Sequence, residues 1–450
     1  MENRGTFGSK LAIVLTTAGS AVGLGNIWRF PFMTGQNGGA AFILIYLGCV
    51  FLLGIPGMIS EFIVGRHSQS NAARAYSSLG YKSGRWIGYL GILTSTIILG
   101  FYAVVAGWCL QYLLASIAGQ LNGDTTYIVE YFKSFSSDAV RPCLWGVGFV
   151  VITHFVVAQG VEKGIERASK LLMPLLMIIL IILVIASCLL PGAGKGIDFL
   201  LKPDFSKVSG SVFLEALGQA FFSLSLGTAC LCTYASYFKK ETNLLRSATQ
   251  IALLDSAIAI MAGLMIFPAA FSVGVQPDSG PSLIFITLPN VFRQAFETMP
   301  IVGFVISILF YALLVFAALT STISMHEIGT AFFHEELHLA RSKAAWILTI
   351  VCATITIFCS LSVGAYSNLQ LFGMPLMDFC DFLTAQIMLP AGAFFTSILL
   401  GWFVEQRLLI NEFTNNGALK ATFFKAYLFS VKFIVPLCIL LIFLHQFNII

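Results

Sequence analysis

Long apolar runs without charge recur along this chain, and they constrain its fold more than any other feature. Hydrophobic residues make up 58% of the 450 positions and charged residues only 10%, whereas a soluble domain carries about 25% charged residues. Only helices or closed barrels satisfy their own backbone groups in lipid, and the runs lack the alternation of barrel strands. The sequence therefore predicts an all-α polytopic membrane protein whose main surroundings are the lipid bilayer.

Eleven runs are long enough to cross a bilayer, which takes about 20 residues of helix. The segment 119–141 is expected to be external, and the proline-interrupted segment 276–299 is expected to form a hairpin over the outer face. The predicted spans are about 11–35, 40–65, 88–118, 142–160, 167–190, 211–237, 247–275, 300–333, 343–363, 371–403 and 426–447.

The distribution of Lys and Arg predicts the orientation of the spans. With the N-terminus inside, 18 of the 25 basic residues fall on the inner side and 6 on the outer side, as the positive-inside rule requires. We therefore expect a multi-pass protein of the cell membrane with a cytoplasmic N-terminus and, because the number of spans is odd, an external C-terminus. The net charge of +4 follows from this topology and indicates no nucleic-acid partner.

The first span is poorly suited to form a helix. Its middle reads AGSAVGLGNIWRFPF (18–32), with glycines at Gly19, Gly23 and Gly25 and a proline at Pro31. Glycine costs a helix interior about 1 kcal/mol and proline about 3 kcal/mol. Glycine in membrane helices can also serve close packing between helices, so one such span is ambiguous.

A second poor helix former lies at the corresponding place of a second set of spans. The sixth span contains SLSLGT (223–228), and it opens a set of five spans that runs opposite to the first set. Broken helices at matching positions of two inverted halves point to a transporter's binding site. We interpret 1–450 as one transporter domain with inverted repeats at about 11–190 and 211–403 and an extra span at about 426–447.

Unwound backbone offers two kinds of ligand at membrane depth. Its free carbonyls bind a cation, and the N–H groups that begin the next half-helix bind an anion. A zwitterion such as an amino acid, together with sodium, matches both.

These features carry a family resemblance. Together with NGGAAFILIY (37–46), GIERASKLLMP (164–174) and AALTSTIS (317–324), the two broken spans make essentially the whole chain similar to the neurotransmitter:sodium symporter family, in its bacterial amino-acid branch. The resemblance implies a sodium-coupled secondary active transporter that imports an amino acid by alternating access. It implies no enzyme activity and no cofactor besides Na⁺, for which two sites are expected.

The resemblance also implies the ligands of both sodium ions, which are all hard oxygen groups suited to such a cation. The first sodium site would comprise the Ala21 carbonyl and the side chains of Asn26, Ser223 and Asp255, with the substrate carboxylate as a further ligand. The second sodium site would comprise the carbonyls of Gly19, Val22 and Ala317 and the hydroxyls of Thr320 and Ser321.

The implied substrate site lies beside them. Monoamine carriers of the family have an acid where this chain has Gly23, so an amino acid is favoured, and Thr228 in place of a bulky aromatic leaves room for an apolar or aromatic side chain. The carboxylate would meet the N–H groups of Leu24 and Gly25 and the Tyr102 hydroxyl, and the ammonium the carbonyls of Ala21, Phe222 and Ser223. The side-chain pocket would comprise Ile98, Tyr102, Phe222, Ser225, Thr228, Ser321 and Met325.

Charged residues inside a membrane are energetically costly, so each of them is a candidate for a functional role. By resemblance, Arg29 and Asp381 would form an outer gate above Phe222 and Tyr102, although a static packing pair is the alternative. Arg4 and Glu335 would form the inner gate, with Ser236 and Tyr237 nearby and Phe7 in place of the usual Trp. Arg4 could also be an ordinary positive-inside residue. Glu61 is expected to accept hydrogen bonds from the broken end of the first span.

Asp255 departs from chloride-dependent relatives, which have Asn there. The implied chloride neighbourhood of Tyr46, Gln219, Ser223 and Ala259 offers no oxygen at Ala259, and Asp255 brings its own negative charge. We therefore expect chloride-independent transport, with proton antiport through Asp255 as a further hypothesis.

Two other functions fit parts of the sequence. HEELH (334–338) matches H-E-x-x-H, in which His334 and His338 on one helix face would bind zinc with Glu335 as base, and such a site also needs a third ligand. An intramembrane zinc protease is therefore one alternative, and a sodium channel built on the same spans is the other.

Overall fold

A computed structural model describes residues 5–274, 282–366 and 368–446. Nine single helices in the described part are long and apolar enough to cross a membrane, and a tenth candidate is a bent pair. The remaining predicted span is divided into two short helices, α11 and α12, so each of the predicted spans has its counterpart. The all-α polytopic fold class is confirmed.

The first half of the chain contains the first five spans. The bent span is α1 (Lys10–Ala21) with η1 (Gly25–Arg29) and α2 (Phe30–Gln36), and the second is α3 (Ala40–Cys49), η2 (Val50–Gly54) and α4 (Ile55–Ser68). Then follow α5 (Ala72–Ser77), η3 (Lys82–Gly84), α6 (Arg85–Ile117), α7 (Thr125–Ser136), α8 (Arg141–Ala158), η4 (Val161–Glu166), α9 (Arg167–Cys188), α10 (Gly194–Leu201) and η5 (Phe205–Lys207).

The second half begins with the divided span, α11 (Gly210–Ser223) and α12 (Cys230–Ala235). A short antiparallel pair, β1 (Gln370–Leu371) and β2 (Met374–Pro375), precedes the tenth span. The other elements are α13 (Leu244–Ser272), η6 (Leu283–Thr287), α14 (Leu288–Ala295), α15 (Pro300–Glu336), α16 (Arg341–Val363), α17 (Leu376–Asp381), η7 (Phe382–Met388), α18 (Leu389–Ile398), η8 (Leu399–Phe403), α19 (Gln406–Phe413), α20 (Phe424–Phe429), η9 (Ser430–Ile434) and α21 (Val435–Gln446).

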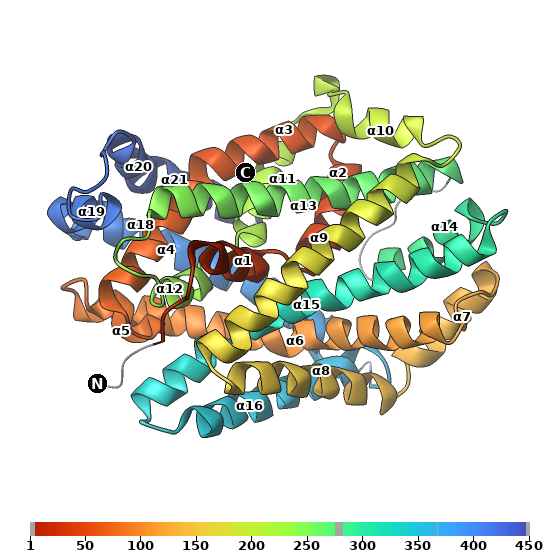
Figure 1. The fold of residues 1–450 in the computed structure, drawn as a ribbon, viewed down its shortest axis with the longest axis horizontal. Coiled ribbons are helices and arrows are strands. Elements are labelled where there is room, and N and C mark those ends of the chain that lie inside the picture. Colours follow the sequence, from red (N-terminus) through yellow and green to blue (C-terminus); the bar gives the residue numbers. More distant parts are fainter. Residues whose placement is uncertain (1–4, 275–281, 367, 447–450) are drawn as a thin grey trace.

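The helices run roughly along the long axis of the molecule (Figure 1). Helix α1 lies in the middle and packs against α9, α13 and α15, while α6 packs against α8, α15 and α16. One end carries α5 and α19, which we call the predicted cytoplasmic end, and the other carries α7, α10 and α14, the predicted external end (Figure 1). Both broken spans therefore lie between neighbouring helices rather than at the periphery.

The residues that the structure describes test only part of the expected external hairpin. The chain is helical from Leu283 to Ala295 and passes through Pro289 without a break, and the Ile284 carbonyl in this stretch accepts a hydrogen bond of 2.9 Å from the Tyr311 hydroxyl. Phe285 stacks on Phe132 of α7 at 5.6 Å between ring centroids. The helix is thus fixed against the protein, and the rest of the expected hairpin at 275–281 lies outside the described residues.

A buried arginine joins three segments at the predicted cytoplasmic end. Arg66, at the end of α4, is 1% exposed. Its Nε donates to Glu412 Oε2 of α19 at 2.8 Å, and its Nη1 donates to the Thr242 carbonyl at 2.6 Å and to Asn415 Oδ1 at 2.8 Å. Arg66 therefore ties the second span to the loop before α13 and to α19.

The charge of Glu412 stabilises this junction. Burial opposes its ionisation, but the hydrogen bond with His67 and the charges of Arg66 and Lys240 outweigh burial and lower the pKa of Glu412 to about 2. A lowered pKa stabilises the fold above the unfolded value, which is about 4.3 for Glu. That contribution is lost only as the pH falls through about 2.

We predict that Glu412→Ala destabilises the protein at neutral pH by about 3–5 kcal/mol, because Arg66 would stay buried without its counter-charge. Thermal unfolding of the purified protein in detergent measures this. The control is Asp198→Ala, which removes the partner of Lys202 in an exposed pair and should cost about 0–1 kcal/mol. Equal melting temperatures for the two variants would contradict the prediction.

Candidate functional site

The break in the first span is held by side chains of its neighbours. Helix α1 ends at Ala21, and the chain bends by 59° between α1 and the helical segment Gly25–Gln36. The Gly23 N–H donates to Asn26 Oδ1 at 3.0 Å and the Leu24 N–H donates to the Tyr102 hydroxyl at 2.9 Å. Ser321 Oγ donates to the Val22 carbonyl at 3.0 Å. Polar side chains thus replace the hydrogen bonds that the helix gives up.

Gly23 is required by close packing. A Cβ there would lie 2.6 Å from Ser321 Oγ and 2.9 Å from the Tyr102 hydroxyl oxygen. A side chain at this position would therefore require the Ser321 and Tyr102 hydroxyls to move from the break.

The break in the sixth span is wider. Between α11 and α12, the left-handed φ angles of Ser225 (53°), Gly227 (83°) and Ala229 (60°) end the helix. Glu61 of α4 accepts hydrogen bonds from the Gly227 N–H at 2.7 Å and the Cys232 N–H at 3.3 Å. This corrects the expectation that Glu61 braces the first span.

The reason is the close packing of α4 on α12. A Cβ on Gly65 of α4 would lie 1.9 Å from the Cys232 carbonyl oxygen. Only glycine permits this approach, and it brings Glu61, one turn earlier on α4, to the second break rather than the first.

A buried carboxylate joins the two breaks. Asp255 of α13 is 0% exposed and accepts hydrogen bonds from Ser223 Oγ at 2.6 Å, Asn26 Nδ2 at 2.8 Å and the Tyr46 hydroxyl at 3.5 Å. The structure thus brings three predicted ligands of the first sodium site together, and the fourth, Ala21, is the last residue of α1. These partners from the described part of the chain are all uncharged, so a cation would complete the pairing that a buried carboxylate needs.

The predicted ligands of the second sodium site also come together, from α1 and α15. Thr320 Oγ1 donates to the Ala317 carbonyl at 3.0 Å. A Cβ on Gly19 would lie 3.4 Å from Thr320 Cβ. The Ser321–Val22 hydrogen bond is a further contact between the same two segments, and the polar groups of the predicted set are carbonyl and hydroxyl oxygens.

The residues predicted for the substrate lie around the same two breaks. A Cβ on Gly25 would lie 2.9 Å from the Phe222 ring. Ser225 Oγ donates to the Ser20 carbonyl at 3.4 Å, and Thr228 Oγ1 donates to the Ser225 carbonyl at 2.7 Å.

Two predicted pocket residues are less central. Ile98 and Met325 are half-buried and stand one helical turn from Tyr102 and Ser321, respectively. Met325 packs against a small separate cluster that includes Leu99.

The predicted outer gate is not joined by a direct ion pair. Within the described residues, the Arg29 guanidinium makes no hydrogen bond and no ion pair, and it lies over the Phe222 ring at 4.2 Å from the centroid. Asp381, at the end of α17, is exposed. Arg29 and Phe222 therefore lie together, while the contact with Asp381 is open.

At the predicted cytoplasmic end, Arg4 lies outside the described residues. Glu335 accepts hydrogen bonds from the backbone N–H of Asn71 at 2.7 Å and from its Nδ2 at 3.0 Å. Phe7 is 1% exposed, and its ring packs edge-on against Tyr237. Phe7, which stands where the family usually has a Trp, is thus buried against the predicted inner gate residue Tyr237.

Sequence reasoning missed a fully buried charge near this gate. Glu327 of α15 pairs with Arg341 and accepts a hydrogen bond from the Tyr237 hydroxyl at 2.5 Å. The sequence did indicate this residue, because Glu327 is a carboxylate inside a predicted span, and charged residues in such positions are candidates for a functional role.

The zinc alternative needs two histidines on one helix face. Helix α15 ends at Glu336, and His338 has a left-handed φ of 51°. His334 Nδ1 lies 2.6 Å from the Leu339 carbonyl oxygen. HEELH therefore spans a helix end, and no group of three metal-binding side chains occurs in the described parts of the chain.

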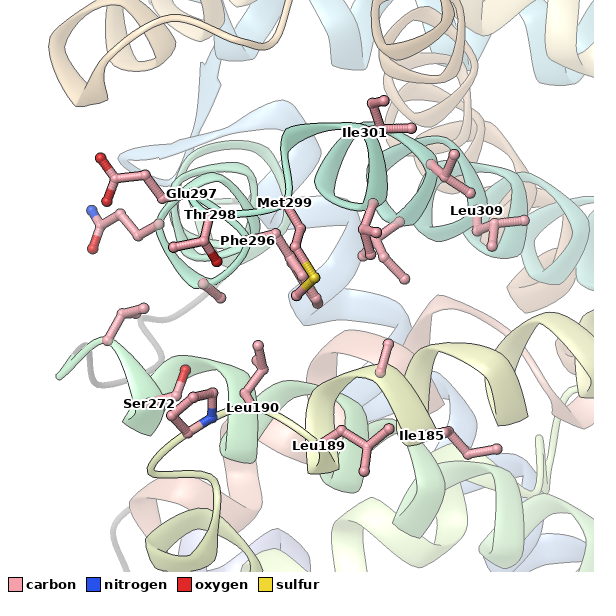
Figure 2. Close-up of a pocket in the computed structure, with 18 of the residues that line it drawn as sticks. Ile185, Leu189, Leu190, Ser272, Phe296, Glu297, Thr298, Met299, Ile301 and Leu309 are labelled. Atoms are coloured by element: carbon pink, nitrogen blue, oxygen red, sulfur yellow. The ribbon is translucent and has the colours of Figure 1, made fainter.

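A large groove lies elsewhere, between α9, α13, α14 and α15 (Figure 2). It encloses about 840 Å³ and is lined mainly by apolar side chains such as Leu189, Met299 and Ile301. None of the predicted site residues lines it, whereas a larger cavity of about 1120 Å³ is lined by the predicted gate residues Tyr237 and Glu335 among others.

Two broken membrane helices whose breaks meet around buried oxygen groups define a class, the polytopic membrane transporters. The family model described as the sodium:neurotransmitter symporter family matches residues 4–134 and 136–450. The chain belongs to this family and is a sodium-coupled transporter.

Relatives of similar length support this. An uncharacterized sodium-dependent transporter of Bacillus subtilis (strain 168) is 39% identical over 98% of this chain and 97% of its own. Another, from Haemophilus influenzae, is 35% identical over 99% and 98%. The crystal structure of MhsT in complex with L-phenylalanine matches with a TM-score of 0.89 and 39% identity over 98% of this chain and 99% of that chain.

We predict that Glu61→Gln destabilises the protein by about 1–3 kcal/mol, because the amide accepts through only one oxygen and leaves a buried N–H of the sixth span unsatisfied. Thermal unfolding in detergent tests this. Glu405→Gln, at an exposed position before α19, is the matched control. A Glu61→Gln protein as stable as this control would show that the second break does not depend on Glu61.

Proposed function

We propose that the protein imports an amino acid with an apolar or aromatic side chain, driven by sodium, through a site between the breaks of α1/α2 and α11/α12. The observation that carries this proposal is the contact of Asn26, Ser223 and Asp255, which joins the two breaks around one buried carboxylate. L-phenylalanine bound to MhsT supports the choice of substrate.

Sodium and substrate would be coupled by sharing a site. Asn26 Nδ2 and Ser223 Oγ both point at the Asp255 carboxylate. A sodium ion there would be held by these side chains, once the Asn26 amide turns its oxygen inward, and by the Ala21 carbonyl. The substrate carboxylate would be a further ligand, so each binds better when the other is present. The second ion would bind to Gly19, Val22, Ala317, Thr320 and Ser321.

The unwound backbone would recognise the rest of the amino acid. The Leu24 N–H and Tyr102 hydroxyl, which now bond to each other, would turn to the carboxylate together with the Gly25 N–H. The carbonyls of Ala21, Phe222 and Ser223 would accept the ammonium. Ile98, Ser225, Thr228, Ser321 and Met325 would surround the side chain beside Tyr102 and Phe222.

Transport would follow from two gates on inverted repeats. Closing the Arg29–Asp381 contact would seal the site from outside, and opening the contacts among Arg4, Glu335 and Tyr237 would release the cargo to the cytoplasm. We place the N-terminus in the cytoplasm and the C-terminus outside, in the cell membrane, following the distribution of Lys and Arg.

A binding screen of the twenty amino acids on the purified protein, in sodium and then in potassium, tests the proposal. We expect saturable binding of L-phenylalanine or another apolar amino acid in sodium and at least about tenfold weaker binding in potassium. Binding of none of them, or binding that ignores the cation, would overturn it.

We predict that Gly23→Ala weakens sodium-dependent amino-acid binding by at least about tenfold, because the added methyl occupies space between Ser321 and Tyr102. Gly48→Ala is the matched control, since a Cβ on Gly48 in α3 would meet nothing within 4 Å. Equilibrium binding of labelled L-phenylalanine compares the two variants. If both bind like the unchanged protein, close packing at the break is not required for binding.

We also predict chloride-independent transport. The Asp255 carboxylate already supplies a negative charge beside Ser223 and Tyr46, so an added anion would be repelled. Replacement of chloride by gluconate should leave sodium-driven uptake into proteoliposomes within about twofold. Abolished uptake in gluconate would refute this. Proton countertransport through Asp255 is a further part of the proposal, which pH changes inside the vesicles would report.

A further inference from the structure

The Arg29 guanidinium lies on α11 rather than against Asp381. It contacts the Phe222 ring of that helix, and Glu215 belongs to the same helix. Neither carboxylate is in ion-pair contact with it in the described structure. Asp381 belongs to the tenth span and Glu215 to α11, so the two carboxylates lie on different elements.

One face of α11 is shaped to receive this cation. Glu215, Gln219 and Phe222 follow at intervals of four and three residues, so they share a helix face. The Phe222 ring already contacts the Arg29 guanidinium. Gln219 is 1% exposed, and its amide has no hydrogen-bond partner in the described residues. The face therefore offers an aromatic ring, a free amide and a carboxylate in order along the helix.

Glu215 is restrained from the other side. Its Oε2 accepts a hydrogen bond of 2.7 Å from Asn37 Nδ2, and Asn37 ends α2, the helix that begins directly after Arg29. The same Asn37 nitrogen also donates to the Met33 carbonyl at 2.9 Å. Asn37 therefore competes with Arg29 for the Glu215 carboxylate.

We propose that Glu215 is a positioning residue of the outer gate, which holds Arg29 on α11 when the contact with Asp381 is open and so sets how readily the gate closes. This inference rests on the proposed function. If two carboxylates compete for Arg29, the arginine spends part of its time near each of them. Removal of Glu215 then favours the closed gate, and removal of Asp381 favours the open gate. The hydrogen bond from Asn37 weakens the attraction of Glu215 for Arg29, and it thereby favours the closed gate, in which Arg29 contacts Asp381.

The test is the dissociation rate of labelled L-phenylalanine from purified protein in sodium. Glu215→Gln should slow dissociation by about three- to tenfold, and Asp381→Asn should speed it. In the Asp381→Asn background, Glu215→Gln should have no further effect, because it acts through that competition. Glu130→Gln, an exposed carboxylate of α7 at the same end, controls for the loss of one negative charge and should leave the rate unchanged.

Asn37→Ala separates this role from a merely structural one. It frees Glu215 for Arg29 and should speed dissociation, opposite to Glu215→Gln. If the hydrogen bond served only to tie α2 to α11, both variants would change the rate in the same direction, and the inference would be wrong. An unchanged rate in Glu215→Gln would also overturn it.

A second readout needs no substrate. Hydrogen–deuterium exchange of the backbone amides between α11 and α12, in sodium, reports how open the outer side is. Slower exchange in Glu215→Gln and faster exchange in Asn37→Ala support the inference, and the reverse order contradicts it. Failure of the proposed function would instead appear as absent sodium-dependent binding in the unchanged protein, whatever the exchange rates are.

Discussion

Backbone groups that leave a helix inside a bilayer must find partners within the protein, and the rest of this structure depends on that demand. An unsatisfied N–H or carbonyl in lipid costs several kcal/mol. The protein meets the demand at the first break with Tyr102 and Ser321 from neighbouring helices, and at the second with the paired oxygens of Glu61. The same polar groups can turn to bind a ligand. The residues that satisfy the backbone hydrogen bonds at the breaks are therefore also the residues of the proposed binding site.

Several buried and half-buried charges around this arrangement differ in their partners. Glu327 with Arg341, and Arg66 with Glu412, are paired directly and tie helices together at the predicted cytoplasmic end. Asp255 has only neutral hydrogen-bond partners among the described residues. Arg29 contacts the aromatic ring of Phe222 and no carboxylate in the described structure.

A permanent partner would fix these two groups in one state. A partner that arrives and leaves suits a transport cycle, and this is why we assign Asp255 to an ion and Arg29 to a gate.

The sequence predicted the spans well because long apolar runs have few other uses. It also found both breaks, since glycine, serine and proline inside a span have a direct energetic cost. It could not predict which break Glu61 would reach, because that depends on the contact between Gly65 and the Cys232 carbonyl, which joins segments far apart in the chain.

The helical path through Pro289 could not be predicted for a related reason. Proline usually interrupts a helix in its middle, and only the structure shows that Tyr311, on another helix, donates a hydrogen bond to the Ile284 carbonyl in this stretch. His338 similarly lies past a helix end that the HEELH pattern does not reveal. Glu327 was different, because its position inside a span was visible and its importance was overlooked.

The central claim is that sodium and substrate share one site at the meeting of the two breaks. Its most direct test is reciprocal binding on the purified protein, with labelled L-phenylalanine titrated at several sodium concentrations and ²²Na⁺ titrated at several L-phenylalanine concentrations. The account predicts that each ligand raises the affinity of the other by the same factor, of about tenfold or more. Saturable binding of both with no effect of either on the other would contradict it.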